Sequence, residues 1–161
     1  MKRNISRTTI AMVFFAMLCV GLAPAVQAQV CSRALTVGKY GVSDSGTVVG
    51  VGPRAATALL TLDAEGNITG NVTANVNGSV THTTVSGLYT VNPDCTGTSR
   101  FGEFDQSGNL ILTVTADLVW DDDMREIRFV FTSAALHDGT PIATVISGSA
   151  KKTFAENSNQ Q

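Results

Sequence analysis

Short alternating segments, cut at regular intervals by turn-forming residues, constrain the fold of this 161-residue chain more than any other feature. From Leu35 onward, eight segments rich in Val, Thr, Ile and Gly are separated by clusters of Gly, Asn, Asp and Pro. The clusters lie at residues 50–53, 64–67, 77–78, 92–94, 106–109, 121–123 and 137–141. Because strands joined by short turns pair as antiparallel neighbours, this spacing predicts an all-β sandwich or barrel.

Alternation of apolar and polar residues is clearest in two of these segments. Every second residue is apolar from 110 to 118, and apolar residues alternate with charged ones from 126 to 129. A period of two places one face of a strand in a core and the other in solvent. Eight such strands leave two exposed edges unless the sheet closes, so we predict a single antiparallel eight-stranded barrel in preference to a sandwich.

A weak internal repeat relates two of the turns. Residues 63–68 (DAEGNI) match residues 105–110 (DQSGNL) at an offset of 42. Asp at the start of such a turn caps it, and Gly takes the left-handed backbone that closes it. We interpret the repeat as two hairpins of the same geometry, and a duplicated half-barrel is the alternative.

The first 28 residues have the order of a secretory signal peptide. They contain a positive start, a 14-residue apolar run at 10–23 and a small-x-small sequence at 26–28. A helix that spans a membrane needs about 20 residues, so we predict a cleaved signal over 1–28 and no later membrane span. The expected organisation is a β-barrel domain over 29–152 and a polar tail over 153–161, in a secreted or periplasmic protein.

Two cysteines, Cys31 and Cys95, remain after removal of the predicted signal peptide. In an oxidising compartment an even pair is most simply one disulfide. Closing a loop of this size contributes on the order of 4 kcal/mol to stability in the chain-entropy description. The chain has no C-x-x-C motif, so we expect a structural disulfide and not a redox or metal pair.

The charge balance argues against a nucleic-acid partner. Residues 1–28 hold three of the 11 basic residues and none of the 13 acidic ones, which leaves 8 basic against 13 acidic residues in the remainder. A mildly acidic domain lacks the basic face that nucleic acids require. The sequence has no phosphate loop, dinucleotide fingerprint or zinc-ligand spacing, so we predict no cofactor and no metal site.

Residues with catalytic or metal-binding chemistry are few. Asp121, Asp122 and Asp123 carry the oxygen ligands that calcium prefers, but the spacing of a calcium loop is missing and a solvated turn is the simpler interpretation. The histidines, His82 and His137, have no nucleophile or metal ligand at a recognisable spacing. We therefore expect no catalytic residues and a protein that is not an enzyme.

Two stretches carry a resemblance to a known group of proteins. One is the glycine–aromatic opening at 38–41 (GKYG), and the other is 87–97 (GLYTVNPDCTG). Together with residues 60–67 they resemble a family of small secreted bacterial proteins of unassigned function, over nearly the whole mature chain. The resemblance implies a small antiparallel barrel of calycin or allene-oxide-cyclase type. It implies no activity and no catalytic residues.

These observations favour an exported barrel that binds a small apolar molecule. We expect Tyr40, Tyr89, Phe129 and Phe131 to line the site, because aromatic side chains that face a lumen are the usual contact surface. A structural or interaction module of the cell envelope with a packed core is one alternative. An isomerase or cyclase, suggested by analogy of fold, is another.

The three classes predict different interiors. A binding module predicts a cavity of several hundred Å³, and a structural module predicts a packed lumen and an exposed apolar patch. An enzyme predicts a titratable group with a shifted pKa in a cleft. Small residues expected to face inward are compatible with a packed or a hollow barrel; they are Ala58, Gly70, Ala74, Gly87, Ala116 and Gly148.

Overall fold

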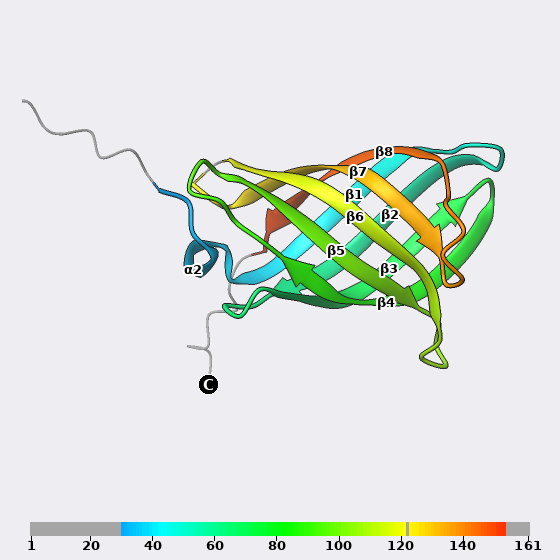
Figure 1. Cartoon of the computed structure of the whole chain (residues 1–161), viewed down its shortest axis with the longest axis horizontal. Helices are drawn as coiled ribbons and strands as arrows, with labels where there is room; N and C mark the ends of the chain where they lie inside the picture. The colour runs from blue at the N-terminus through cyan, green and yellow to red at the C-terminus, as the bar shows by residue number, and fades with distance from the viewer. Residues whose placement is uncertain (1–29, 122, 154–161) are drawn as a thin grey trace, which may run out of the picture.

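The eight predicted segments form eight strands in the computed structural model, which describes residues 30–121 and 123–153 (Figure 1). A four-residue helix, α2 (Arg33–Thr36), precedes them and was not predicted from the sequence. The strands are β1 (Gly38–Val48), β2 (Gly52–Leu62), β3 (Asn67–Val76), β4 (Ser79–Tyr89), β5 (Thr96–Phe104), β6 (Leu110–Asp121), β7 (Glu126–Leu136) and β8 (Thr144–Lys152).

The sheet closes on itself in chain order. Each strand pairs antiparallel with the next, and β8 returns to pair with β1 from Tyr40 opposite Lys152 to Val48 opposite Thr144. Closure removes the two edges that an open sheet would expose. The prediction of a closed eight-stranded antiparallel barrel is therefore confirmed. Across the described residues, nothing helical reaches the length and apolarity that crossing a bilayer requires.

Antiparallel order gives the barrel two ends of different construction (Figure 1). The α2 end holds the helix, the start of β1, the end of β8 and the connections β2–β3, β4–β5 and β6–β7. The far end holds the connections β1–β2, β3–β4, β5–β6 and β7–β8. The tightest of these is the β3–β4 turn, in which Asn77 and Gly78 both have positive φ, as a type I′ hairpin requires.

The two repeated turns have the same hydrogen bonds. Asp63 Oδ1 accepts from the amide of Asn67 at 2.7 Å, and Asp105 Oδ1 accepts from the amide of Asn109 at 2.8 Å. The first turn joins β2 to β3 and the second joins β5 to β6, so they lie at opposite ends of the barrel. A duplicated half-barrel would shift the repeat by four strands and not three, so the two hairpins are similar only in local geometry.

The Cys31–Cys95 disulfide is present, with the Cα atoms 5.0 Å apart. It joins the segment before α2 to the β4–β5 connection, and the amide of Cys31 donates to the carbonyl of Pro93 at 3.3 Å. A disulfide is compatible with an exported protein. The predicted signal peptide, 1–28, lies outside the described residues, as does the predicted tail beyond Thr153.

Candidate binding site in the barrel lumen

The lumen at the α2 end is filled by a plug of buried side chains, which we define as Thr36, Tyr40, Tyr89, Trp120 and Met124. Tyr40 and Thr36 have no exposed surface, and the other three are at most 3 % exposed. Tyr89 and Trp120 contact each other with ring centroids 6.4 Å apart. The plug closes this end of the barrel beneath α2.

Backbone carbonyls satisfy the phenol groups of the plug. Tyr40 Oη donates to the carbonyl of Thr36 at 2.8 Å and lies 3.3 Å from the carbonyl of Met124. Tyr89 Oη donates to the carbonyl of Asp63 at 2.6 Å and lies 2.9 Å from Thr36 Oγ1. Burial, followed by the neighbouring Tyr89, raises the pKa of Tyr40 to about 12. The plug therefore keeps its phenols neutral and hydrogen-bonded.

Beyond the plug, the middle of the lumen holds a cavity of about 70 Å³. Its lining is mostly apolar, with side chains from all eight strands. Pockets that hold drug-sized ligands occupy roughly 300–1,000 Å³, so the cavity is smaller than the sequence-based hypothesis of a binding module requires. As it stands, it accommodates only a very small molecule.

Phenylalanine rings occupy the space that the small inward residues leave. A Cβ on Gly148 would lie 2.6 Å from the ring atom Phe129 Cζ, whereas one on Gly87 would meet the backbone and Cβ of its strand partner Phe101. Phe131 continues this aromatic wall, with its ring centroid 5.9 Å from that of Phe129 and 6.3 Å from that of Phe101. The wall is only partly buried, although its side chains line the cavity.

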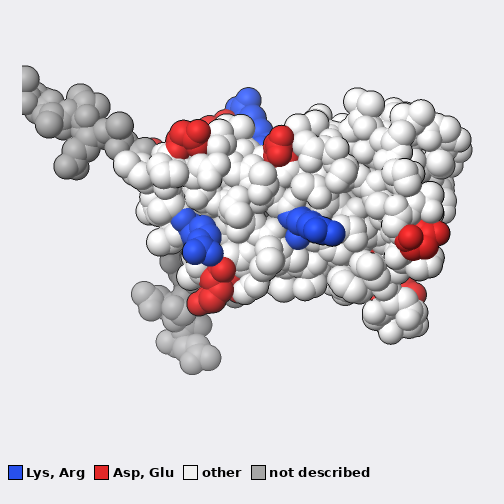
Figure 2. All heavy atoms as spheres, viewed as in Figure 1, with Lys and Arg blue, Asp and Glu red and all other residues white. Residues whose placement is uncertain are grey.

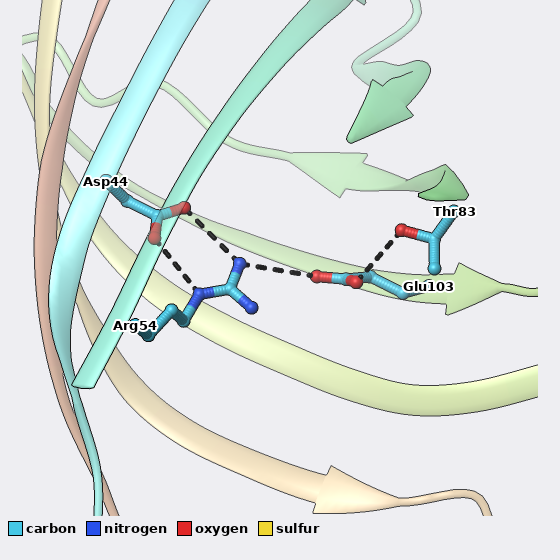
Figure 3. Close-up of polar contacts among 4 residues, drawn as sticks. All are labelled: Asp44, Arg54, Thr83 and Glu103. Carbon is cyan, nitrogen blue, oxygen red and sulfur yellow. Dashed lines mark hydrogen bonds and ion pairs between the residues drawn. The ribbon is translucent and has the colours of Figure 1, made fainter. Parts of the chain in front are cut away.

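Charged side chains cross the lumen at the border of this cavity (Figure 3). Arg54 on β2 reaches Asp44 on β1 with Nε–Oδ1 and Nη2–Oδ2 distances of 3.0 and 3.4 Å. Its Nη2 lies 3.9 Å from Oε1 of Glu103 on β5. Thr83 Oγ1 on β4 donates to Glu103 Oε2 at 3.1 Å. We call these four residues the lumen cluster.

The lumen cluster is buried but incompletely paired. The side chains of Asp44 and Arg54 are each 8 % exposed and that of Glu103 is 5 % exposed. Burial raises the pKa of Glu103, and the nearby charge of Asp44 adds to this, whereas Arg54 and the Thr83 hydroxyl oppose it. Two carboxylates thus share one guanidinium in a largely apolar lumen.

The predicted lining residues lie in two different places. Tyr40, Phe129 and Phe131 line the cavity, although the hydroxyl of Tyr40 points to backbone carbonyls in the plug. Tyr89 is buried in the plug and is not among the residues around the cavity. Contact of these side chains with a ligand stays a prediction.

The lumen cluster was not predicted from the sequence, although strand parity contained a signal for it. Asp44 shares the inward face of β1 with Tyr40 and Val42, and Glu103 shares that of β5 with Ser99 and Phe101. Arg54 has the parity of the buried Leu62 on β2. A charged residue at an inward position of a strand is the pattern that would have identified these groups.

The other singled-out polar residues lie outside the lumen. Asp121 pairs with Arg128, with Oδ2 and Nε 2.8 Å apart, at the α2 end. His82 Nδ1 lies 3.1 Å from Thr73 Oγ1 in an exposed pair, and His137 is exposed in the β7–β8 connection. Among the described residues, no group of three His, Cys, Asp or Glu side chains converges as a metal site would require.

The outer surfaces of the two ends also differ. On the face shown in Figure 2, Lys and Arg lie over the α2 half and the middle of the barrel, and only acidic residues appear toward the far end. The far end exposes Val49, Val51 and Val145, which are 55, 55 and 72 % exposed. Near the α2 end Val30 and Leu88 are 62 and 61 % exposed, so apolar side chains are exposed at both ends and the ends differ mainly in their charge and in the plug.

Comparisons with known proteins support the fold. No protein-family model and no curated protein sequence matches this chain. Among solved structures, EF1p2_mFAP2b bound to DFHBI aligns with a TM-score of 0.55 and 11 % identity over 78 % of this chain and 100 % of that chain. The redesigned β-barrel mFAP1 bound to DFHBI aligns with a TM-score of 0.51 and 11 % identity, over 75 % of this chain and 98 % of that chain. At such low identity, these similarities show the barrel fold alone.

Proposed function

We propose that this barrel binds a small, predominantly apolar molecule in its lumen and is not an enzyme. The observation that carries the proposal is the meeting of an apolar cavity with the buried, incompletely paired charges of Asp44, Arg54 and Glu103. A mostly apolar pocket with a few convergent polar groups is the usual construction of a small-molecule site. Two solved barrels with a similar fold are bound to DFHBI.

Stability does not account for the lumen cluster. Desolvation of buried ions often costs more than their attraction returns, and replacing such groups by packed apolar side chains is often neutral or stabilising. Val42, Ala58 and Leu60 line the same cavity, so apolar residues fit this part of the lumen. A role in recognising a bound molecule explains the presence of charges there.

The aromatic wall reconciles the small cavity with binding. Phe101, Phe129 and Phe131 are held by contacts with one another and with the glycines of neighbouring strands. Rotation of one ring would enlarge the cavity without moving a backbone hydrogen bond. We therefore propose that a ligand of more than a few atoms displaces part of this wall.

Native mass spectrometry tests the proposal on protein purified from its source, followed by organic extraction and identification of the released compounds. A small molecule at a stoichiometric ratio is the expected result. Ala58→Phe, which adds a ring at a cavity-lining position, should abolish co-purification. The outward-facing Ala55→Phe is its matched control on β2. A clean, empty monomer from the source would overturn the proposal.

A structural or interaction module is the second candidate, and two observations favour it. The cavity of about 70 Å³ leaves the lumen nearly filled. The exposed Val49, Val51 and Val145 give the far end an apolar surface of the kind that protein partners cover. An empty monomer in the extraction experiment would favour this candidate.

We also propose that the protein works outside the cytoplasm. The signal-like residues 1–28 and the Cys31–Cys95 disulfide support this compartment. Intact-mass measurement of the secreted or periplasmic fraction should give a chain that begins at Gln29 and gains two hydrogens on reduction. Recovery of a chain that retains residues 1–28 from the cytoplasm would overturn the proposal.

A further inference from the structure

The lumen cluster carries one more negative charge than positive when both of its carboxylates are ionised. Arg54 contacts Asp44 through two nitrogens at 3.0 and 3.4 Å, which is the geometry of a bidentate pair. Its nearest approach to Glu103 is 3.9 Å, beyond hydrogen-bond distance. The guanidinium is therefore committed to Asp44, and Glu103 is the poorly neutralised member.

Glu103 retains an acceptor that the described residues do not use. Thr83 donates to Oε2, whereas Oε1 has only the 3.9 Å ion pair with Arg54. A carboxylate with an unused lone pair in a largely apolar site attracts either a proton or a cationic donor. Burial raises the pKa of Glu103, which is the response of a carboxyl that lacks such a partner.

The cavity beside Glu103 supplies an apolar environment and no further positive charge. Among its described lining residues, the charged ones are Asp44, Arg54 and Glu103. The aromatic wall of Phe101, Phe129 and Phe131 lies in the same cavity, and the faces of such rings attract cations. A cationic group at this position would have a carboxylate and aromatic faces as neighbours, together with the Arg54 guanidinium, which lies 3.9 Å from Glu103 Oε1 and 6.0 Å from the Phe131 ring centroid.

We propose that the molecule bound in the lumen is an apolar amine, with its ammonium group donating to Glu103 Oε1 and its hydrocarbon part against the aromatic wall. This inference rests on the proposed function and specifies its ligand class. An ammonium group brings the charge of the cluster to zero, whereas a ligand carboxylate would add a third negative charge. A neutral alcohol would donate a hydrogen bond without balancing the charge.

The pH dependence of ligand affinity tests the proposal in the unaltered protein. An ammonium group needs ionised Glu103, so its affinity should rise as the pH rises through the Glu103 pKa, and that of an alcohol should not. The groups that face Glu103 are Arg54 from β2, Asp44 from β1 and Thr83 from β4, while its partner on β6 is Leu112. Of these, Asp44 is the other group whose ionisation would contribute to the profile.

The experiment compares three probes of equal length: n-butylamine, n-butanol and butyrate. Binding is followed by NMR chemical-shift titration of the full mature chain at a series of pH values from 4 to 8. We expect n-butylamine to bind at least about tenfold more tightly than n-butanol at pH 7, a difference of about 1.4 kcal/mol. The preference should shrink as the pH falls through the raised Glu103 pKa, and butyrate should bind most weakly at pH 7.

Glu103→Gln should reduce the preference for n-butylamine to within about threefold of n-butanol, because the neutral amide no longer balances the ammonium charge but still offers an oxygen to either probe. The control is Glu126→Gln, which removes a carboxylate paired with Lys151 at the α2 end and should leave the preference intact. If Glu103→Gln fails to fold, the pH series on the unaltered protein still decides the question.

The outcomes separate this inference from the proposed function. Binding of n-butanol or butyrate as tight as that of n-butylamine overturns the amine inference and leaves lumen binding standing. A preference that survives in Glu103→Gln or does not change with pH also overturns it. If none of the probes binds and extraction from the source yields no small molecule, both proposals fail.

Discussion

The plug and the lumen cluster both bury polar side chains inside one barrel, but they do so with different chemistry. In the plug, Tyr40 and Tyr89 are neutral, and each hydroxyl donates to a backbone carbonyl at 2.8 or 2.6 Å. In the lumen cluster, three ionisable groups share incomplete contacts, the weakest being the 3.9 Å separation of Arg54 and Glu103. The plug satisfies both of its tyrosine hydroxyls, although Trp120 Nε1 beside them is buried without a hydrogen-bond partner among the described residues, whereas the lumen cluster leaves a charged acceptor on Glu103 unused.

This difference separates a structural role from a functional one. A buried neutral hydroxyl with a good acceptor costs little and fixes a ring in place. A buried ion is costly and becomes favourable only when its remaining hydrogen-bonding capacity is met. The plug therefore closes and stabilises the barrel, whereas the lumen cluster is a feature that a ligand would complete.

The largest expected change in the free energy of unfolding comes from removing the disulfide, which joins the segment before α2 to the β4–β5 connection. Replacing Cys31 and Cys95 together by Ser should lower the free energy of unfolding by about 4 kcal/mol, because the loop of 64 residues is no longer constrained in the unfolded chain. Urea denaturation measures it, with reduced and oxidised unaltered protein as the control pair. A loss below about 1 kcal/mol would mean that the plug holds this segment without the covalent link.

Removing the only cation of the lumen cluster should give the next effect. Arg54→Met leaves Asp44 and Glu103 buried without a counter-charge and should cost about 3 kcal/mol. Arg128→Met is the control, because its pair with Asp121 involves a side chain that is 68 % exposed, and its loss should cost less than about 1 kcal/mol. Equal losses in thermal or urea unfolding would contradict the claim that the lumen environment makes Arg54 special.

Tyr40→Phe tests the plug itself. The variant removes the donor to the carbonyls of Thr36 and Met124 and should cost about 1–2 kcal/mol below pH 10, compared with at most about 0.5 for the exposed Thr90→Val. In the unaltered protein, the folded pKa of about 12 exceeds the ordinary 10.0, so this stabilisation is lost as pH rises through about 12. Alkaline denaturation that is unchanged in Tyr40→Phe would contradict this assignment.

How far the sequence predicts this structure depends on the range of the interactions involved. Local sequence patterns predict the strand alternation and the Asp-capped turn at Asp63, and both are present in the structure. The pairing of Cys31 with Cys95 is also present, and it could be predicted because these two cysteines allow a single disulfide. The filling of the lumen depends on which ring packs against which glycine across strands, as Phe129 does at Gly148. That information requires the register of the barrel, so the sequence left packed and hollow interiors equally open.

The candidate site could be predicted from the sequence only in part, for the same reason. The inward parity of Tyr40, Phe129 and Phe131 follows from alternation, and all three line the cavity. Arg54 meets Glu103 only because β2 and β5 face each other across the closed barrel, a relation that strand order alone does not give. Charged residues at inward positions would have identified the members of the cluster but not their contacts.

Glu103→Gln should change the free energy of unfolding least. It tests whether the lumen cluster stabilises or destabilises the fold. Because burial raises the folded pKa of Glu103 above its ordinary 4.5, its stabilising contribution is present below that value and is lost as pH rises through the raised pKa. The variant escapes this loss but also loses the long contact with Arg54, so it should be more stable than the unaltered protein at pH 7 by less than about 1 kcal/mol.

Urea denaturation from pH 4 to 8 measures the free energy of unfolding of both proteins. The difference between Glu103→Gln and the unaltered protein should disappear near pH 4. Asp105→Asn provides a control of opposite sign, because hydrogen bonds from Asn109 lower the pKa of Asp105, so its stabilisation is present at neutral pH and lost as pH falls. If Glu103→Gln instead loses more than about 1 kcal/mol at pH 7, the pair with Arg54 stabilises the fold. The lumen cluster would then resemble the plug in role, and the contrast between the two regions would no longer argue for a ligand.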